Sequence, residues 1–275
     1  MSRSKLVSKQ LREFYETSSE EKRLEGGLGT LEFSRNKTLI SKYITNPNSI
    51  ILDIGGGTGK YAKWLAKKGH LVHLIDPIEK HVNRASKRAA KLENPFTAEL
   101  GEARNLPFEH NMADAVILHG PLYHLQKTED RAKALLEAKR VLKPGGILLG
   151  FTINYTASTL VGLWQGLIHE AGFYKMCLEE LTTGIHNPPA DFPWLLADAY
   201  YHNPSVLKSE IDDCGFDFID LHAVEGMAWI DSKYFENMAN PERRDNLMNL
   251  IEQTENDQNL LAFSPHMMIA ASKAH

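Results

Sequence analysis

Several features that mark particular protein classes are scarce in this sequence of 275 residues. It has only two cysteines, Cys177 and Cys214, too few for a disulfide framework or a thiolate metal site, and this fits a reducing cytoplasm. No apolar run approaches the roughly 18 residues of a membrane span, and the first ten residues lack the apolar core of a signal peptide. We therefore expect a soluble, unprocessed cytoplasmic protein without a membrane partner.

Positive charge is not in excess either. The 31 Lys and Arg residues face 35 Asp and Glu residues, giving a formal net charge of -4. The field of the whole molecule therefore supplies no general attraction to phosphate backbones, which disfavours nucleic acid as a partner. With 43% hydrophobic and 24% charged residues, the composition is that of an ordinary globular protein. At about 100 to 200 residues per domain, the length allows one domain with a sizeable insertion.

Short β-rich runs alternate with amphipathic helical stretches between residues 49 and 153. The predicted strands are 50–54, 71–75, 113–118 and 147–151. A helical pattern follows each of the first three strands, so the connections read as crossover helices. This βαβ alternation predicts a parallel sheet with at least four strands.

The pattern changes after residue 153. Residues 155–201 are rich in aromatics and interrupted by glycine and proline, without a strand period, and we interpret them as a largely helical insertion. Helical patterns also cover 6–24, 31–44 and about 205–214, and strands are expected at 216–224 and near 266–271. The predicted division is a helical N-terminal segment at 1–47, a core at 48–154, a cap insertion at 155–202 and completion of the sheet at 203–275.

A glycine-rich loop, GGGTG at 55–59, follows the first predicted strand. Such a loop lets the backbone approach a ligand closely and directs helix amides toward it. Lys60 stands where the dinucleotide fingerprint G-x-G-x-x-G has its third glycine. Asp53, before the loop, would repel a pyrophosphate but suits an ammonium group, and Asp76 ends the second strand where a carboxylate can accept ribose hydroxyls. The expected ligand is a nucleoside with a cationic tail.

Five ordered motifs occur at regular places along residues 49–151. They are ILDIGGGTG at 51–59, LIDP at 74–77, EARNLPF at 102–108, ADAV at 113–116 and VLKPGG at 141–146. Together they resemble the class I S-adenosylmethionine-dependent methyltransferases. The resemblance implies an α/β fold with a doubly wound, mostly parallel, seven-stranded Rossmann-like sheet and a helical cap. It also implies methyl transfer to an O, N or C atom of a small organic molecule.

The resemblance further implies which residues bind the cofactor S-adenosylmethionine, whose product is S-adenosylhomocysteine. The expected cofactor-binding residues are Asp53, Gly55, Gly57, Asp76, Pro77, Glu102, Ala103 and His119. The glycines would pack against the methionine part, Asp53 would order the loop or hold the amino group through water, and Asp76 would bind the ribose. Glu102 stands where Asp is commoner, and a backbone contact to adenine at Ala103 would survive this change.

The loop after the fourth predicted strand reads HGPLYHL at 119–125. It lies at the carboxyl edge of the sheet, where ligands bind in such folds. We expect Tyr123 and His124 to be catalytic, by shaping the acceptor pocket or taking a proton, since neutral histidine is a suitable base near pH 7. Packing under the insertion is the alternative for both. The loop differs from the N-P-P-Y type of many amine-specific relatives, which disfavours a nucleobase or glutamine target.

Side chains in the insertion suit the enclosure of a small organic acceptor. They are Trp164, His169, Phe173, Tyr174, Trp194, Tyr200, Tyr201 and His202. A helical cap with a core of its own is the alternative. N-terminal side chains could likewise close over the cofactor, namely Tyr15, Glu21, Arg23, Glu32, Phe33 and Arg35.

Three other functions compete with small-molecule methyl transfer. Lys60 and Asp53 both oppose a nicotinamide-dependent oxidoreductase. An RNA methyltransferase would be supported by a basic surface stripe, which the net charge of -4 does not favour. A cofactor-binding protein without turnover would lack an ordered acceptor pocket. No acid-acid-Asn set stands at the strand ends, so we assign no metal.

Overall fold

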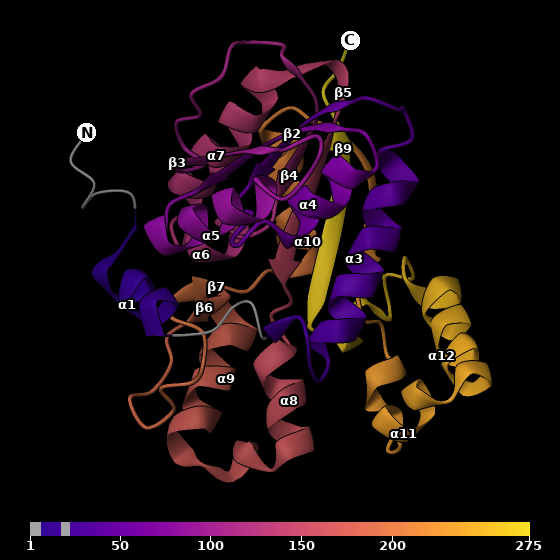
Figure 1. Ribbon diagram of the computed structural model, residues 1–275. Coiled ribbons are helices and arrows are strands. Elements are labelled where there is room, and N and C mark those ends of the chain that lie inside the picture. Colours follow the sequence, from indigo (N-terminus) through magenta and orange to yellow (C-terminus); the bar gives the residue numbers. More distant parts are fainter. Residues whose placement is uncertain (1–6, 18–22) are drawn as a thin grey trace.

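The computed structural model describes residues 7–17 and 23–275. Part of the first predicted helix and Glu21 therefore lie outside the described residues. A seven-stranded sheet forms the centre of the molecule, with helices on both of its faces (Figure 1). This arrangement places the described chain in the α/β class with three layers.

The sheet has the expected mostly parallel order. Its strands are β1 (Ile50–Ile54), β2 (Leu71–Asp76), β3 (Thr97–Leu100), β4 (Ala113–Leu118), β5 (Leu142–Ile153), β8 (Asp217–Ala223) and β9 (His266–Ser272). Their spatial order is β3-β2-β1-β4-β5-β9-β8, in which the first five are parallel and β9 is antiparallel to both of its neighbours. The predicted doubly wound, seven-stranded fold class is thus confirmed.

Helices account for most of the remaining structure. They are α1 (Lys9–Thr17), α3 (Gly29–Tyr43), α4 (Lys60–Lys67), α5 (Glu79–Ala89), α6 (Pro121–His124), α7 (Thr128–Val141), α8 (Ala157–Gln165), α9 (Ala171–Thr183), α10 (Pro204–Asp213), α11 (Tyr234–Ala239) and α12 (Pro241–Thr254). Side chains of α3, α4 and α5 pack on one face of the sheet, and those of α7 and α10 pack on the other. None of these helices, in the part of the chain that is described, has the length and apolar character to cross a bilayer.

The central strands are apolar because both of their faces are covered. Leu52 and Ile54 of β1 belong to the cluster that contains α7 and α10, whereas Ile51 belongs to the cluster that contains α3 and α4. Alternate residues of a strand point to opposite faces, so a strand buried on both sides needs a continuous apolar run. This is the pattern that predicted β1 and β4 with their observed bounds.

A cap follows β5 and lies beyond the carboxyl edge of the sheet, together with α1 (Figure 1). It contains α8, α9 and a two-stranded sheet formed by β6 (Ile185–His186) and β7 (Ala199–Tyr200), which the expectation of a largely helical insertion did not include. The cap has a buried cluster of its own around Phe173 and Cys177. The residue boundaries proposed between N-terminal segment, core and cap stay a prediction.

A buried ion-pair network fixes α3, the helix that brings Glu32 and Asn36 to the edge of the sheet. Arg35 is fully buried and donates to the backbone carbonyl of Val224 at 3.1 Å and to the carboxylate of Glu255, which also accepts from Lys42. Burial alone would raise the pKa of Glu255, but hydrogen bonds from His222, Lys42 and Arg35 outweigh it and lower that pKa to about 2.

We expect Glu255→Gln to lower the free energy of unfolding at neutral pH by about 3 kcal/mol, because the buried charge of Arg35 loses its partner. Since folding lowers the pKa of Glu255, its carboxylate stabilises the fold above its ordinary pKa of 4.5, and this contribution is lost as the pH falls toward about 2. Denaturant titrations at several pH values should therefore show the difference between wild type and variant narrowing in acid.

The matched control is Glu252→Gln. Glu252 is 50% exposed and lies 3.9 Å from the same Arg35 guanidinium, so its loss should cost less than about 1 kcal/mol. An equal loss of unfolding free energy in the two variants would contradict a special role of Glu255.

Candidate functional site

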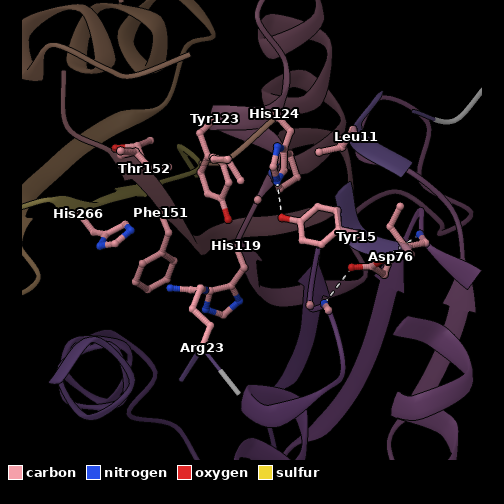
Figure 2. Close-up of a pocket in the computed structure, with 18 of the residues that line it drawn as sticks. Leu11, Tyr15, Arg23, Asp76, His119, Tyr123, His124, Phe151, Thr152 and His266 are labelled. Carbon is pink, nitrogen blue, oxygen red and sulfur yellow. Dashed lines mark hydrogen bonds between the residues drawn. The ribbon is translucent and has the colours of Figure 1, made fainter. Parts of the chain in front are cut away.

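A cavity of about 430 Å³ opens at the carboxyl edge of the sheet. Its walls combine the glycine loop, the ends of β2 and β5, the loop after β4, helix α1 and side chains of the cap. Figure 2 shows Asp76 of β2, His119 after β4 and Tyr15 of α1 around this cavity. The volume is within the range of about 300 to 1,000 Å³ that is usual for small-molecule and cofactor sites.

The structure gathers nearly all of the predicted site residues around this cavity. Those that line it are Gly55, Gly57, Asp76, Pro77, Glu102, Ala103, His119, Tyr123 and His124. Asp53 is fully buried behind the wall, where it contacts His119. Residues 49 to 124 thus supply most of the wall on the side of the glycine loop.

The glycine loop needs glycine for two separate reasons. Gly55, Gly57 and Gly59 have φ values of 74°, 56° and 77°, in the left-handed region that other residues rarely adopt. Gly56 lacks this conformation, but a Cβ there would lie 2.6 Å from Oδ2 of Asp53. A Cβ on Gly57 would meet no atom of the described chain within 4 Å. Because Gly57 lines the cavity, its bare backbone leaves a surface on which a ligand can rest.

Asp76 connects the end of β2 to the glycine loop. Its Oδ2 accepts from the backbone N–H of Gly57 at 2.9 Å, and its Oδ1 accepts from the backbone N–H of Ile78 at 2.9 Å. The imidazole Nδ1 of His81 lies 3.1 Å from Oδ1. Oδ2 retains room for a second donor, because a carboxylate oxygen can accept two hydrogen bonds. The carboxylate can therefore hold the loop and bind a hydroxyl at the same time.

Glu102 and Ala103 contribute in different ways. Oε2 of Glu102 accepts from the backbone N–H of Arg104 at 3.0 Å and from its Nε at 2.7 Å. The carboxylate is thus held by Arg104, while Ala103 is buried and lines the cavity. This arrangement agrees with a ligand contact through the backbone at Ala103.

Tyr15 and His124 join the N-terminal helix to the loop after β4 (Figure 2). The Tyr15 hydroxyl and His124 Nε2 lie 2.7 Å apart although the residues are 109 positions apart in the chain. Burial, with a smaller contribution from the charge of His81, lowers the pKa of His124 to about 3. His124 is therefore a neutral imidazole at physiological pH.

The cap and the N-terminal segment each supply part of the aromatic side chains expected from the sequence. Of the cap residues, Phe173, Trp194 and Tyr201 line the cavity. Trp164 packs on Trp229 instead, Tyr174 is exposed, Tyr200 lies under Arg131, His202 contacts Glu210, and His169 is not part of the wall. From the N-terminal set, Tyr15, Arg23 and Glu32 line the cavity, whereas Phe33 packs on Tyr61 and Arg35 is in the ion-pair network.

His266, at the start of β9, also lines the cavity but was not among the predicted site residues. Its Nδ1 lies 2.6 Å from Oε1 of Glu225, a carboxylate that is 2% exposed. Burial alone would lower the pKa of His266, but the charges of Glu225 and Glu32 outweigh it and raise that pKa to about 9. In a parallel sheet, ligand groups are expected at the carboxyl ends of strands. Strand β9 is antiparallel, so its first residue, His266, lies at that edge of the sheet, and the expectation misses it.

Glu32, Glu225 and His266 each place one possible metal-ligand atom within 4.8 Å of the others. Arg23 already forms an ion pair with Glu32 through both carboxylate oxygens, and the protonated His266 faces Glu225. The two carboxylates are thus neutralised by protein cations. We describe the group as an ion-pair cluster and assign no metal to it.

Comparison with known proteins agrees with this geometry. Residues 52–150 match a family model described as a methyltransferase domain. The chain is 34% identical over 186 residues to the ubiquinone/menaquinone biosynthesis C-methyltransferase UbiE of Vibrio cholerae, an alignment that covers 66% of this chain and 68% of that protein. The chain belongs to the class I S-adenosylmethionine-dependent methyltransferases.

Other similarities support this family. The uncharacterized methyltransferase YodH of Bacillus subtilis is 34% identical over 125 residues, which cover 44% of this chain and half of YodH. A crystal structure of a methyltransferase from Methanosarcina mazei superimposes with a TM-score of 0.58 at 19% identity, over 86% of this chain and 97% of the other. One from Mesorhizobium loti gives a TM-score of 0.58 at 16% identity, over 90% and 99%. At these identities the two structures show the fold alone.

The cavity of this methyltransferase fits its cofactor, S-adenosylmethionine. The open surface at Gly57 suits the methionine part, and the free acceptor capacity of Asp76 suits ribose hydroxyls. Pro77 and Ala103 offer apolar and backbone surface for the adenine. We propose that these residues, with Gly55 and Glu102 beside them, hold the cofactor.

We expect Asp76→Ala to weaken binding of S-adenosylhomocysteine to the methyltransferase by about 1.5 to 3 kcal/mol, the range for a hydrogen bond to a charged group. Calorimetry measures the affinity. NAD should not bind, because Lys60 stands where the dinucleotide fingerprint has its third glycine. Glu99→Ala, at an exposed position of neighbouring β3, is the control that should leave affinity unchanged. Unchanged affinity in a folded Asp76→Ala variant would place Asp76 outside the cofactor site.

We expect Glu225→Gln to lower the pKa of His266 from about 9, because the neighbouring carboxylate charge is a main cause of its elevation. Since folding raises this pKa, protonated His266 stabilises the fold below its ordinary pKa of 6.5, and that stabilisation is lost as the pH rises toward about 9. NMR titration of the imidazole measures the pKa directly. Glu242→Gln, an exposed position on α12, should leave it unchanged, and an unaltered titration in Glu225→Gln would refute the assignment.

Proposed function

We propose that this methyltransferase transfers a methyl group to an O, N or C atom of a small, largely apolar molecule bound beneath the cap. The observation that supports this most is that one cavity is lined both by the glycine loop and by Phe173, Trp194 and Tyr201 of the cap. An acceptor beneath these aromatic side chains would therefore share one enclosed space with the cofactor.

The lining of the cap side indicates the character of the acceptor. Ile153, Ala157 and Val161 supply apolar surface. Oγ1 of Thr152 is buried and has no hydrogen-bond partner within residues 7–17 and 23–275, so an acceptor with a polar group would satisfy it. The relatives named as C-methyltransferases of ubiquinone and menaquinone biosynthesis support an organic ring compound as the acceptor class.

The chemistry places modest demands on the protein. S-adenosylmethionine supplies a methyl group that its positive sulfonium already activates for displacement. The residues of the chain therefore have to orient the acceptor and exclude water, and such alignment can supply up to about 7 to 11 kcal/mol of the barrier reduction. Leu11 and Phe14 of α1 line the cavity and, with the cap, would cover the reacting groups.

His124 has a different place in this proposal from the one expected from the sequence. A base with a pKa of about 3 holds almost no protons near neutrality, so the low pKa does not support His124 as the proton acceptor. Its hydrogen bond to Tyr15 instead supports a positioning role, in which the pair holds α1 over the pocket. Tyr123, in the same short helix, would shape the acceptor side of the wall.

Nucleic acid and membrane partners are not part of this proposal. The net charge of -4 gives no general attraction to a phosphate backbone. Cys177 and Cys214 are both free and buried, which fits action in a reducing cytoplasm.

The acceptor class can be tested with S-adenosylmethionine that carries a deuterated methyl group. The enzyme is incubated separately with the small-molecule, RNA and protein fractions of a cell extract, and mass spectrometry locates the label. We expect label in the small-molecule fraction, and far less of it with Asp76→Ala at a limiting cofactor concentration. Label in the RNA or protein fraction alone would overturn the proposed acceptor class.

A further inference from the structure

Asp53 and His119 form a buried pair behind the cavity wall. Asp53 is fully buried at the end of β1, and Nδ1 of His119 lies 2.8 Å from its Oδ1. A carboxylate can only accept hydrogen bonds, and in a carboxylate–imidazole pair the shared proton belongs to Nδ1 of His119. In neutral His119, Nε2 is then the ring nitrogen that carries the free lone pair.

Two aromatic rings fix the plane of this imidazole. His119 stacks on Tyr61 with ring centroids 4.2 Å apart and on Phe151 with centroids 4.6 Å apart, at interplanar angles of 15° and 16°. The ring is therefore held between two flat surfaces while Asp53 fixes its rotation within the plane. Such double support is the arrangement that keeps a reacting group pre-organised.

Nε2 of His119 is buried and has no hydrogen-bond partner among the residues that the structure describes. A buried acceptor without a partner costs free energy, and such an atom calls for an explanation in a ligand or in the chemistry. His119 lines the cavity, and Figure 2 draws it between Phe151 and the Tyr15–His124 pair. A bound molecule with an N–H, O–H or acidic C–H group would give Nε2 its missing partner.

The other histidines of the wall are engaged differently. Nδ1 of His81 lies 3.1 Å from Oδ1 of Asp76, Nε2 of His124 lies beside the Tyr15 hydroxyl, and His266 is a cation held by Glu225. Nδ1 of His124 is also buried without a partner among the described residues, but burial lowers the pKa of His124 to about 3, so it is a weak base. His119 differs because Asp53 and two aromatic rings fix its imidazole.

We propose that His119 is the general base of methyl transfer and that Asp53 is its positioning partner. As the acceptor atom bonds to the methyl carbon, the carbon–sulfur bond breaks and leaves its electron pair on sulfur, while the acceptor's proton passes to Nε2 of His119. The products are the methylated acceptor, S-adenosylhomocysteine and an imidazolium whose Nδ1–H is still donated to Asp53. This inference rests on methyl transfer itself and holds for any protic acceptor atom.

Charged and aromatic groups from several elements surround His119. Asp53 on β1 and Glu32 on α3 are carboxylates that interact with it, and the cations that interact with Glu32 are Arg23 and His266. Tyr61 on α4 is kept neutral because burial raises its pKa well above the ordinary value, and Phe151 on β5 does not titrate.

NMR of the enzyme with bound S-adenosylhomocysteine tests the pair without any acceptor. With ¹⁵N-labelled histidine, and with His119→Gln used to assign the signal, we expect a protonated Nδ1 and an unprotonated Nε2 above the midpoint of the His119 titration. Asp53→Asn keeps the shape of Asp53 but offers an amide N–H to Nδ1, so the proton should move to Nε2 and the midpoint should fall. A protonated Nε2 in neutral wild-type His119, or signals unchanged by Asp53→Asn, would overturn the proposal.

Rates of methyl transfer from labelled S-adenosylmethionine to the small-molecule extract supply the second readout. His119→Gln and Asp53→Asn should each slow transfer by about 10² to 10⁴, with affinity for S-adenosylhomocysteine within about threefold of wild type. His110→Gln, which removes an exposed histidine, is the matched control and should keep the wild-type rate. The acid limb of the wild-type pH–rate profile should coincide with the NMR titration of His119.

Two results would reject the general base even if the fraction that accepts the methyl group proves to be RNA or protein. One is a wild-type rate in His119→Gln with any labelled fraction. The other is an acid limb that does not follow the His119 titration. His119→Asn provides a second variant if melting curves or cofactor binding show that His119→Gln is misfolded.

Discussion

The buried carboxylate of Asp53 is the constraint on which the site depends. A charge removed from water must be partnered, and Asp53 sits fully buried at the end of a central strand. His119 meets one of its oxygens, and the other lies so close to Gly56 that a Cβ there would clash at 2.6 Å. The side chain of Asp53 thus explains why a histidine, His119, follows β4. It also explains why residue 56 of the loop is glycine, although the φ angle of Gly56 does not require glycine.

Strand register brings these groups together. Ile54 of β1 pairs with Leu118 of β4, and the backbone N–H of His119 donates to the carbonyl of Ile54 at 3.0 Å. A shift of one residue in this pairing would turn the imidazole to the opposite face of the sheet. The apolar faces of both strands, which are buried on two sides, prevent such a shift. Packing of the core therefore sets the geometry of the polar groups at its edge.

Local sequence patterns predicted much of the fold and of the cofactor side of the site. Apolar runs ended by turn residues fixed β1 and β4, and the motifs from Asp53 to Ala103 lie on consecutive elements. β3 escaped detection because Thr97–Leu100 is short and alternates between exposed and half-buried positions. The pairs Tyr15–His124 and Glu225–His266 escaped because their partners are 109 and 41 residues apart, and no local period encodes such contacts.

The reversed direction of β9 has a consequence for how this enzyme can change. It brings His266, from late in the chain, to the same wall as the cap, so most residues on that side come from 152–201 and from residue 266. The residues proposed to hold the cofactor come from 55–103, a separate stretch. Substitutions in the two sets are therefore largely independent in sequence. Acceptor preference can therefore diverge in descendants of this gene while the hydrogen bonds of Asp53 and Asp76 stay the same. The same holds for a library of variants that is restricted to the residues on the cap side.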